Sequence, residues 1–546
     1  ALHGGETVQV NLQDGAVDFT DPAHSQRHAD FPLNPRLVPI PYSDDTSLDE
    51  NEAAQARLQE RKFLFLFTKE ELNSILLPMV EKGVEPLGSM GDTARLAVLS
   101  DQPRSFFDFF YQHFAQVTNP PLDYLREQWV TDLTTYIGPN PNIFAKQELI
   151  PPPIALELPS PILSLGQMAY IRSLEGTDET GIRSLTLPMT YDRLYGATDL
   201  LHQLDVIGNR AVEAVRSGVH VLILSDETAD WDRLPIPALL AMRAVIKQLN
   251  KAGLRLRTSL VLHTAQIRTT HQFSAAIGFG ATAVCPYQAL QLARTEPSKK
   301  LADWSPAERE RSLIKAMEKG LLKVMSKAGI SVARAYQSSK LFSIIGLDKD
   351  LCADYFKNVP SLVGGIGLEE IAERAEDEAK LGEAAKEEGK LYNNFLIKEH
   401  ARGKEGEKHS MTNARSRIIH NLVREEHTDE EGQKLWDDYM DSGRSQEPIS
   451  IRHLLRPHHT TPEDALLLEE VQPEEDVLTT FGSGAMSFGA ISDESQRDIF
   501  YAMRALGGRS NSGEGGENPF YHTEGISASI KQVASGRFGV TARYLI

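Results

Sequence analysis

The chain has 546 residues, 41% hydrophobic and 24% charged, which is typical of a soluble globular protein with about three domains. No apolar run approaches the roughly 20 residues of a membrane-spanning helix, so no membrane segment is expected. The net charge of −19 argues against a general affinity for nucleic acid, whose phosphates attract Lys and Arg. Two cysteines, Cys285 and Cys352, are too few for a disulfide framework and favour a reducing compartment.

The first 60 residues are polar, interrupted by Pro and Gly, and are interpreted as a lead-in. Within them, an Asp-Gly pair separates two alternating runs in "VQVNLQDGAVDF", a pattern typical of a β-hairpin. After residue 60, Thr68 and Glu71 have the spacing of a capping box, and Gly83 follows the last residue of an apolar helical pattern. The sequence therefore predicts a helix that begins after Thr68 and ends before Gly83.

Short apolar runs alternate with amphipathic segments in the middle of the chain. Strands are predicted at 220–225, 257–264 and 281–286, and helices at 237–253 and 269–280. Buried runs joined by helices are typical of βαβ units with a parallel sheet. The sequence therefore predicts an α/β fold whose central domain has a largely parallel, barrel-like sheet.

The carboxyl ends of these strands are where ligands bind in α/β sheets. Ser225, Asp226, Glu227 and residues 263–266 are predicted to lie there. The alternative, that they are only helix caps or solvated loop residues, stays open. Cys285, at the end of an apolar run, is expected to be a small buried hydrophobic residue rather than a nucleophile.

Two helical segments of different character follow. Ser305 and Pro306 mark the start, and Gly329 the end, of one or two amphipathic helices. Between residues 369 and 410 the composition shifts to Glu, Lys and Ala, which favours a solvated helix at a domain boundary.

The α/β pattern restarts at Val471. "VLTTFGSGAMSFG" predicts a strand that runs into a loop of small residues, and 492–508 predicts a helix with Ser492 as N-cap. "RSNSGEGGENPF" is a second Gly-rich loop. Neither loop has the spacing of a P-loop or of a dinucleotide-binding fingerprint. By chemistry alone, both a phosphate or flavin site and ordinary tight turns remain open.

Several long motifs, taken together and in order, resemble the large subunit of glutamate synthase. "GAMSFGAIS", "GGRSNSGEGGENP" and "SIKQVASGRFGVT" resemble the opening of its FMN-binding domain. "EPLGSMGDTARLAVLS", "FAQVTNPPLDYLRE", "IGFGATAV" and "KAMEKGLLKVMSKAGIS" resemble its central domain. The resemblance implies that 1–60 is a linker after a glutaminase domain, 61–370 the central α/β domain, 371–470 a charged helical linker, and 471–546 the start of a (β/α)8 FMN barrel.

The resemblance also implies the reaction, in which an oxidoreductase transfers the amide nitrogen of glutamine to 2-oxoglutarate and yields two glutamates. Ammonia crosses an internal tunnel, and FMN and a 3Fe-4S iron-sulfur cluster serve the parent enzyme. Electrons come from ferredoxin or from a nicotinamide-dependent small subunit. The glutaminase nucleophile and the cluster cysteines are expected outside this chain, which alone should hold no cofactor and be inactive. The expected compartment is the cytoplasm, or a plastid in a eukaryote.

The site residues follow from the same resemblance. No catalytic residue and no metal ligand is expected within the chain. Lys531 suits a flavin site chemically, because a cation stabilises negative charge on the ring or its phosphate. The cofactor-binding residues implied are Ala485, Met486, Ser487, Glu514, Lys531 and Gln532.

"QVTNPPLD" resembles the family segment that borders the ammonia tunnel. The small, non-basic polar residues implied to line it are Thr118, Asn119 and Asp123. A Pro-braced turn whose Asn caps the next helix explains the same letters equally well.

Two other functions are weighed against the enzyme. A non-catalytic scaffold or interaction module derived from this region is compatible with every residue. A different FMN-dependent barrel oxidoreductase, of the dihydroorotate dehydrogenase kind, explains the last part of the chain but not the central motifs.

Overall fold

The structure is a computed structural model in which contacts divide the chain into a first unit, residues 1–454, and a second unit, residues 455–546. Among the described residues no helix is both long enough and apolar enough to cross a membrane. The residues described are 7–10, 17–20, 36–43, 52–86, 92–114, 124–140, 154–176, 180–393, 396–397, 406–424, 427–444, 448–455, 458, 460–533 and 542–545.

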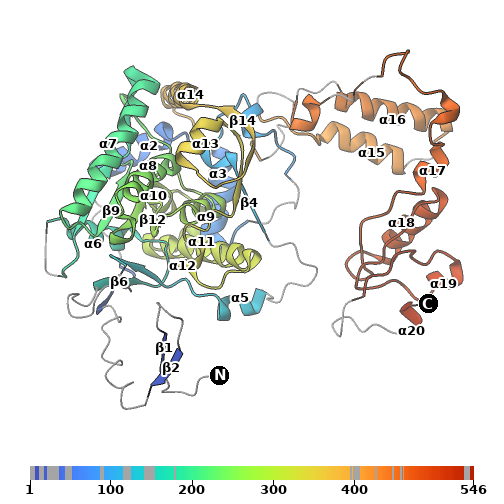
Figure 1. Ribbon diagram of the computed structural model, residues 1–546. Helices are drawn as coiled ribbons and strands as arrows, with labels where there is room; N and C mark the ends of the chain where they lie inside the picture. The colour runs from blue at the N-terminus through green and yellow to red at the C-terminus, as the bar shows by residue number, and fades with distance from the viewer. Residues whose placement is uncertain are drawn as a thin grey trace. The chain divides into compact units, whose positions relative to one another are not determined.

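A four-stranded parallel sheet forms the centre of the first unit (Figure 1). Its strands, in sheet order, are β12 (Ala283–Cys285), β11 (Ser259–His263), β9 (Val221–Ser225) and β7 (Ser184–Pro188). The helices that connect them are α7 (Gly196–Arg216), α8 (Ala238–Lys251) and α9 (Thr270–Gly278). The three predicted strands, the two predicted helices and the parallel pairing are therefore confirmed, while closure of a barrel stays a prediction.

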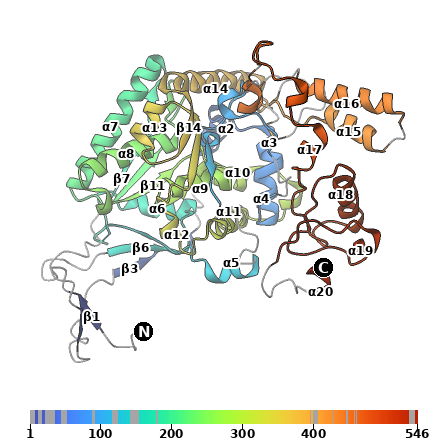
Figure 2. The same ribbon diagram turned by 45° about the vertical axis from the view of Figure 1, so that its right-hand side comes forward.

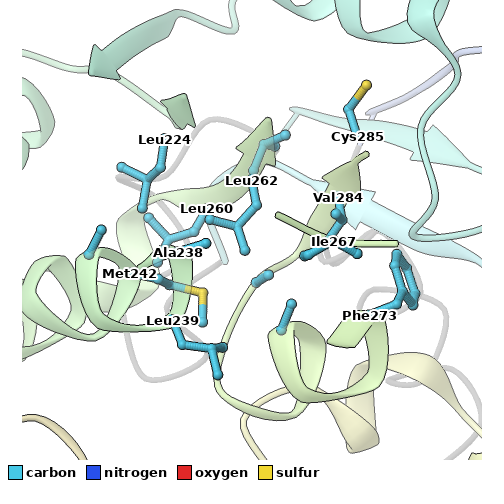
Figure 3. Close-up of a cluster of buried hydrophobic side chains, with 14 of the residues drawn as sticks. Leu224, Ala238, Leu239, Met242, Leu260, Leu262, Ile267, Phe273, Val284 and Cys285 are labelled. Atoms are coloured by element: carbon cyan, nitrogen blue, oxygen red, sulfur yellow. The ribbon is translucent and has the colours of Figure 1, made fainter. Parts of the chain in front are cut away.

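Apolar side chains bury this sheet. Every residue of β9 and β11 is buried, as expected for strands covered on both faces. Figure 3 shows Leu224, Leu260 and Leu262 of the strands together with Leu239 and Met242 of α8. Apolar contact of this kind is worth about 25 cal/mol for each Å² removed from water, so the sheet depends on its helices.

Cys285 at the end of β12 belongs to the same core. It is fully buried, and burial raises the pKa of its thiol well above the usual value. A buried neutral thiol is a poor nucleophile. The expectation of a small buried hydrophobic residue is confirmed.

Smaller sheets surround the central one. β13 pairs in parallel with β14 and antiparallel with β4, and β6 pairs in parallel with β3 and antiparallel with β5. The antiparallel β1–β2 pair confirms the predicted hairpin. The strands outside the central sheet are β1 (Thr7–Val10), β2 (Val17–Thr20), β3 (Arg36–Pro39), β4 (Phe110–Gln112), β5 (Thr135–Ile137), β6 (Ile154–Leu158), β8 (Thr190–Asp192), β10 (Arg233–Pro235), β13 (Phe342–Leu347) and β14 (Ser361–Ile366).

The remaining helices of the first unit start and stop where their sequences indicate. The capping box of Thr68 and Glu71 is present, and Gly83 ends the segment with a left-handed φ of 58°, although a π-helical turn separates α3 from α4. Ser305 caps α11, and Gly329 ends it as one continuous helix. These helices are α2 (Glu52–Leu64), α3 (Lys69–Glu71), α4 (Leu77–Lys82), α5 (Tyr124–Val130), α6 (Leu165–Ser173), α10 (Tyr287–Thr295), α11 (Pro306–Ala328), α12 (Ala333–Tyr336), α13 (Lys349–Tyr355), α14 (Leu368–Glu388), α15 (Asn413–Arg424) and α16 (Asp429–Arg444).

Helix α14 corrects one expectation. The charge run predicted to be a solvated helix packs against α2 and α7 within the first unit, and Figures 1 and 2 both show it beside them. Its buried face consists of Ile371, Ala372, Ala379, Gly382 and Ala385. Small residues at helical spacing let the backbone approach its neighbour, while Glu and Lys occupy the other faces. The predicted limits of the domains remain predictions.

The second unit corrects the strand predicted near its start. The strand predicted at "VLTTFGSGAM" is absent, because residues 474–478 form α17 (Glu474–Leu478). Pro473 precedes this helix and three acidic residues fill its first turn, which favours a helix start. The helix predicted at 492–508 is confirmed as α18 (Asp493–Ala505), with Ser492 as its N-cap. Two short helices, α19 (Tyr521–Glu524) and α20 (Ala542–Leu545), complete the described part.

Isolated parallel bridges nevertheless keep the βα order in the second unit. Gly482 pairs with Arg509, and Asn511 pairs with Ile530, so three short segments lie side by side with α18 and α19 between them. In the described part of this unit, the buried apolar cluster is small and comprises Phe500, Tyr521, Ile526 and Ala528.

Candidate functional site

The two Gly-rich loops of the second unit lie against each other. The Ser487 hydroxyl oxygen accepts a hydrogen bond from the backbone N–H of Gly515 at 3.1 Å. A Cβ added to Gly513 or Gly515 would come within 2.6 Å of the Ser487 side chain. Such a contact with the Ser487 Cβ excludes a side chain at Gly515, and the left-handed φ of 61° favours glycine at Gly513.

The first loop presents bare backbone on its other side. A Cβ at Gly484 or Gly489 would meet nothing within 4 Å, and Ala485 is exposed. Met486 and Ser487 are half-buried, and the Met486 carbonyl accepts a hydrogen bond from Gln496. Accessible backbone beside small side chains fits close approach of a phosphate or a flat ring. The residues present therefore fit the predicted cofactor, FMN.

Lys531 lies in a buried ion pair of the second unit. Its ammonium is 2.9 Å from a Glu517 carboxylate oxygen, and it also donates to the Tyr544 carbonyl at 3.0 Å. Glu517 was not predicted; the only sequence signal for it is a second carboxylate in the loop that holds Glu514. The Gln532 side chain donates to Asn511 at 3.5 Å, which joins the third segment to the second. The structure thus brings Ser487, the Glu514 loop, Lys531 and Gln532 into one unit.

The predicted tunnel residues cannot be placed in the same way. Thr118, Asn119 and Asp123 lie outside the described residues. Their assignment to a tunnel stays a prediction.

A buried polar cluster occupies the carboxyl ends of β9 and β11 in the first unit. His263 Nδ1 lies 2.8 Å from the Ser225 hydroxyl oxygen and 3.1 Å from an Arg172 nitrogen. Arg can only donate, so Nδ1 accepts and the imidazole is neutral. Burial, together with the Arg172 charge, lowers the pKa of His263 to about 3. Arg172 also pairs with Glu227 at 2.7 Å, although no spacing in the sequence pointed to Arg172.

Asp226 is the second centre of this cluster. It accepts hydrogen bonds from the Thr264 hydroxyl at 2.5 Å, the Ala265 N–H at 3.0 Å and the Gln266 side chain at 3.1 Å. Burial outweighs these bonds and raises the pKa of Asp226 to about 6. The residues predicted at the strand ends are thus brought together, and they bond to one another as in a structural network.

We expect His263→Gln to make the chain less sensitive to acid. Unfolded His gains a proton near pH 6.5 and native His263 only near pH 3, so its contribution to stability falls as the pH drops between these values. Between pH 7 and pH 5 the variant should lose less free energy of unfolding than the wild type, by up to about 2 kcal/mol. Urea unfolding at both pH values measures this difference.

Asp226→Asn supplies the opposing control. The native pKa of Asp226 is raised, so its contribution to stability grows as the pH falls from about 6 toward 3.8. This variant should therefore lose more stability than the wild type between pH 7 and pH 5. Equal acid losses in the three chains would show that neither group is held in the state described.

The fold and loops define an α/β protein with a central parallel sheet and a second βα array that carries two adjoining Gly-rich loops. Two protein-family models match this chain, one over most of the first unit and one that includes the second unit. Residues 60–348 match the family described as the glutamate synthase central domain, and residues 409–546 match the conserved region in glutamate synthase. The first match covers more than half of the chain. The chain belongs to the glutamate synthase family.

Curated relatives agree along the length of the chain. The NADPH glutamate synthase large chain of Bacillus subtilis is 33% identical over 568 residues, covering 100% of this chain and 35% of the relative. The chloroplastic ferredoxin-dependent glutamate synthase of Spinacia oleracea is 34% identical over 520 residues, covering 88% of this chain and 31% of the relative. The chain thus spans about a third of the length of these relatives.

Among solved structures, one match is the flavin-binding domain of baker's yeast flavocytochrome b2, with a TM-score of 0.27 and 8% sequence identity. The match covers 58% of this chain and 100% of that domain. A mandelate oxidase complex with benzoyl-formic acid matches 51% of this chain and 96% of its own, with a TM-score of 0.20 at 13% identity. Scores of this size do not establish a shared fold.

Proposed function

We propose that this chain is the region of a glutamate synthase that links the glutaminase part to the FMN part and begins the FMN barrel. The whole enzyme would transfer the amide nitrogen of glutamine to 2-oxoglutarate and release two glutamates. The observation that carries the proposal is the match of the entire chain to a glutamate synthase large chain at 33% identity. The order of the central and conserved family regions along the chain supports it.

Within that enzyme, the two Gly-rich loops would hold the FMN, which when bound supplies hydride transfer. Ala485, Met486 and Ser487 would line one side of it with bare backbone and one hydroxyl. Glu514 and Gln532 would stand in the neighbouring segments. Lys531 would contribute a positive charge near the ring or phosphate, in balance with Glu517.

Other parts of the enzyme would complete the reaction. A 3Fe-4S cluster would carry electrons from reduced ferredoxin or from a nicotinamide-dependent small subunit, and relatives of both kinds match this chain. Thr118, Asn119 and Asp123 would border the ammonia tunnel. The enzyme would work in the cytoplasm, or in a plastid in a eukaryote.

We expect Ser487→Trp to reduce the FMN content of the full-length enzyme at least tenfold, because an indole at this half-buried position would fill the space between the two loops. The flavin absorbance per protein of the purified enzyme measures this loss. Ser495→Trp, an equally bulky change at an exposed position in the first turn of α18, should retain the flavin. Normal flavin content in the Ser487 variant would refute the assignment of this loop.

The chain by itself should hold no FMN and make no glutamate. Among the described residues of the second unit, the buried apolar cluster has four members, which gives a cofactor pocket little support. Glutamate production by the purified 546-residue chain supplied with glutamine and 2-oxoglutarate would contradict this expectation.

The alternative is a non-catalytic scaffold that keeps the fold of this region. Sequencing the coding DNA on both sides of the chain separates the two. Continuous coding for a glutaminase domain upstream and a cysteine cluster downstream supports the enzyme, and stop codons at both sides support the scaffold.

A further inference from the structure

A cavity of about 740 Å³ lies in the first unit, beyond the carboxyl ends of β9 and β11. Leu234 and Pro237 line it from the segment that follows β9, and Gln266 and Arg268 from the segment that follows β11. Ligands of parallel sheets bind on this side, and the volume is that of a small-molecule site. We call this cavity the α14 pocket, because one face of α14 forms its wall.

Two opposite charges of α14 line the pocket one helical turn apart, Arg374 and Glu378. In the part of the chain that the structure describes, neither a hydrogen bond nor an ion pair of 4 Å or less is formed by Glu378. Burial raises the pKa of Glu378 to about 7, although Arg268 and Arg374 oppose this shift. The helix thus presents a carboxyl group that has polar neighbours but no bonded partner.

Arg374, which lines the pocket together with Glu378, has N–H donors that no protein acceptor in the described residues uses. One of its terminal nitrogens donates to the Ala97 carbonyl at 3.0 Å, and its guanidinium lies 5.7 Å from the centre of the Phe109 ring. A guanidinium has five N–H donors, so one such bond leaves most of them for a ligand carboxylate.

The other cations of the pocket are already neutralised. Arg268 pairs with Glu71 at 2.9 Å, and Arg104 pairs with Asp108 at 2.9 Å. A phosphate ligand would need surplus positive charge, which these pairs do not leave. Arg374 and Glu378 remain as one positive and one negative group that a ligand with both charges can pair with.

Apolar side chains complete the wall. They include Phe106, Phe109, Ile75, Leu396 and Ile397. A carboxylate and a guanidinium one turn apart, next to apolar surface, match the ammonium, carboxylate and side chain of an amino acid. We propose that the α14 pocket binds a free α-amino acid with an apolar side chain, its ammonium at Glu378 and its carboxylate at Arg374.

Calorimetric titration of the 546-residue chain with L-leucine, L-methionine and L-phenylalanine tests this proposal. At least one should bind about tenfold more tightly than 3-phenylpropionate, which lacks the amine, and phenethylamine, which lacks the carboxylate. Binding should weaken about tenfold from pH 8 to pH 6, because the carboxyl of Glu378 becomes protonated.

Variants distinguish the site from non-specific binding. Glu378→Gln should weaken binding about tenfold and remove its pH dependence, and Ala375→Leu should block the pocket by filling it. Glu373→Gln, five residues before Glu378 and exposed on α14, should bind as the wild type does. Thermal melting checks that each variant folds.

The proposal is overturned if none of the three amino acids binds more tightly than the two single-charge probes. It is equally overturned if folded Glu378→Gln and Ala375→Leu chains bind as the wild type does. Neither result bears on the proposed FMN site, because the titration requires no flavin.

Discussion

Replacing Glu310 with alanine should lower the free energy of unfolding of the first unit by about 3–5 kcal/mol. One Glu310 oxygen lies 2.5 Å from Arg294, in an ion pair whose side chains are 0% and 2% exposed. The other oxygen accepts a hydrogen bond at 2.9 Å from the backbone N–H of Leu165, at the start of α6. The variant leaves a guanidinium buried without this carboxylate, which costs far more than the lost attraction. Urea unfolding measures the change.

Two comparisons isolate the cause. Glu310→Gln keeps an acceptor for the Leu165 N–H but lacks the charge, so its loss should be intermediate. Lys300→Ala removes an ion pair with Glu81 in which Lys300 is 75% exposed, and should cost about 1 kcal/mol or less. If Glu310→Ala costs no more than Lys300→Ala, burial does not determine the strength of this pair.

Gly382→Ala in α14 should destabilise the first unit by about 1–3 kcal/mol. A Cβ at this position would lie 2.4 Å from the Phe63 carbonyl oxygen of α2. Backbone cannot move aside as a flexible side chain can, so the two helices must separate. Helix propensity alone predicts the opposite, a gain of about 1 kcal/mol from replacing a glycine inside a helix.

Gly432→Ala in α16 is the matched control, because the nearest atom to its added Cβ is Leu422 Cδ1 at 3.9 Å. This variant should gain up to about 1 kcal/mol. Thermal unfolding of both variants should therefore show changes of opposite sign. Two stabilised chains would mean that α14 does not pack closely on α2.

The central sheet could be predicted from the sequence because its signals are local. Each residue of β9 and β11 lies in a short apolar run, and amphipathic helices with caps separate these runs. No knowledge of distant contacts is needed to recognise this alternation. The same holds for α11, whose N-cap Ser305 and final Gly329 are both visible in the letters.

The two wrong predictions depended on distant partners. The strand was predicted at 477–486, which begins with Val, Leu and two Thr, but among the described residues of this run only Gly482 forms a bridge to another segment. The acidic residues after Pro473 favour a helix instead. In α14 the charges suggested solvent on all sides, whereas Ala379 and Gly382 pack on neighbours far away in the chain. Burial of small residues leaves a weak periodic signal.

The candidate sites could be predicted from the sequence only in part. The Gly-rich loops stand out by composition, and their contact through Ser487 and Gly515 agrees with a shared role. The ion-pair partner of Lys531 could not be predicted from the sequence. Whether Glu514 or Glu517 reaches Lys531 depends on how the backbone of the loop runs, and the sequence does not show this. The α14 pocket was likewise hidden, since a cavity arises only from segments brought together by folding.

The order of the central sheet has a consequence for how the protein is made. β7, β9, β11 and β12 lie in the sheet in the order in which a ribosome releases them. Each new strand thus finds its partner already synthesised, one connecting helix earlier in the chain. Sheets with such local pairing form faster than sheets whose neighbours come from distant segments. We expect this region to assemble strand by strand during translation, and to shield its apolar faces before the second unit has emerged.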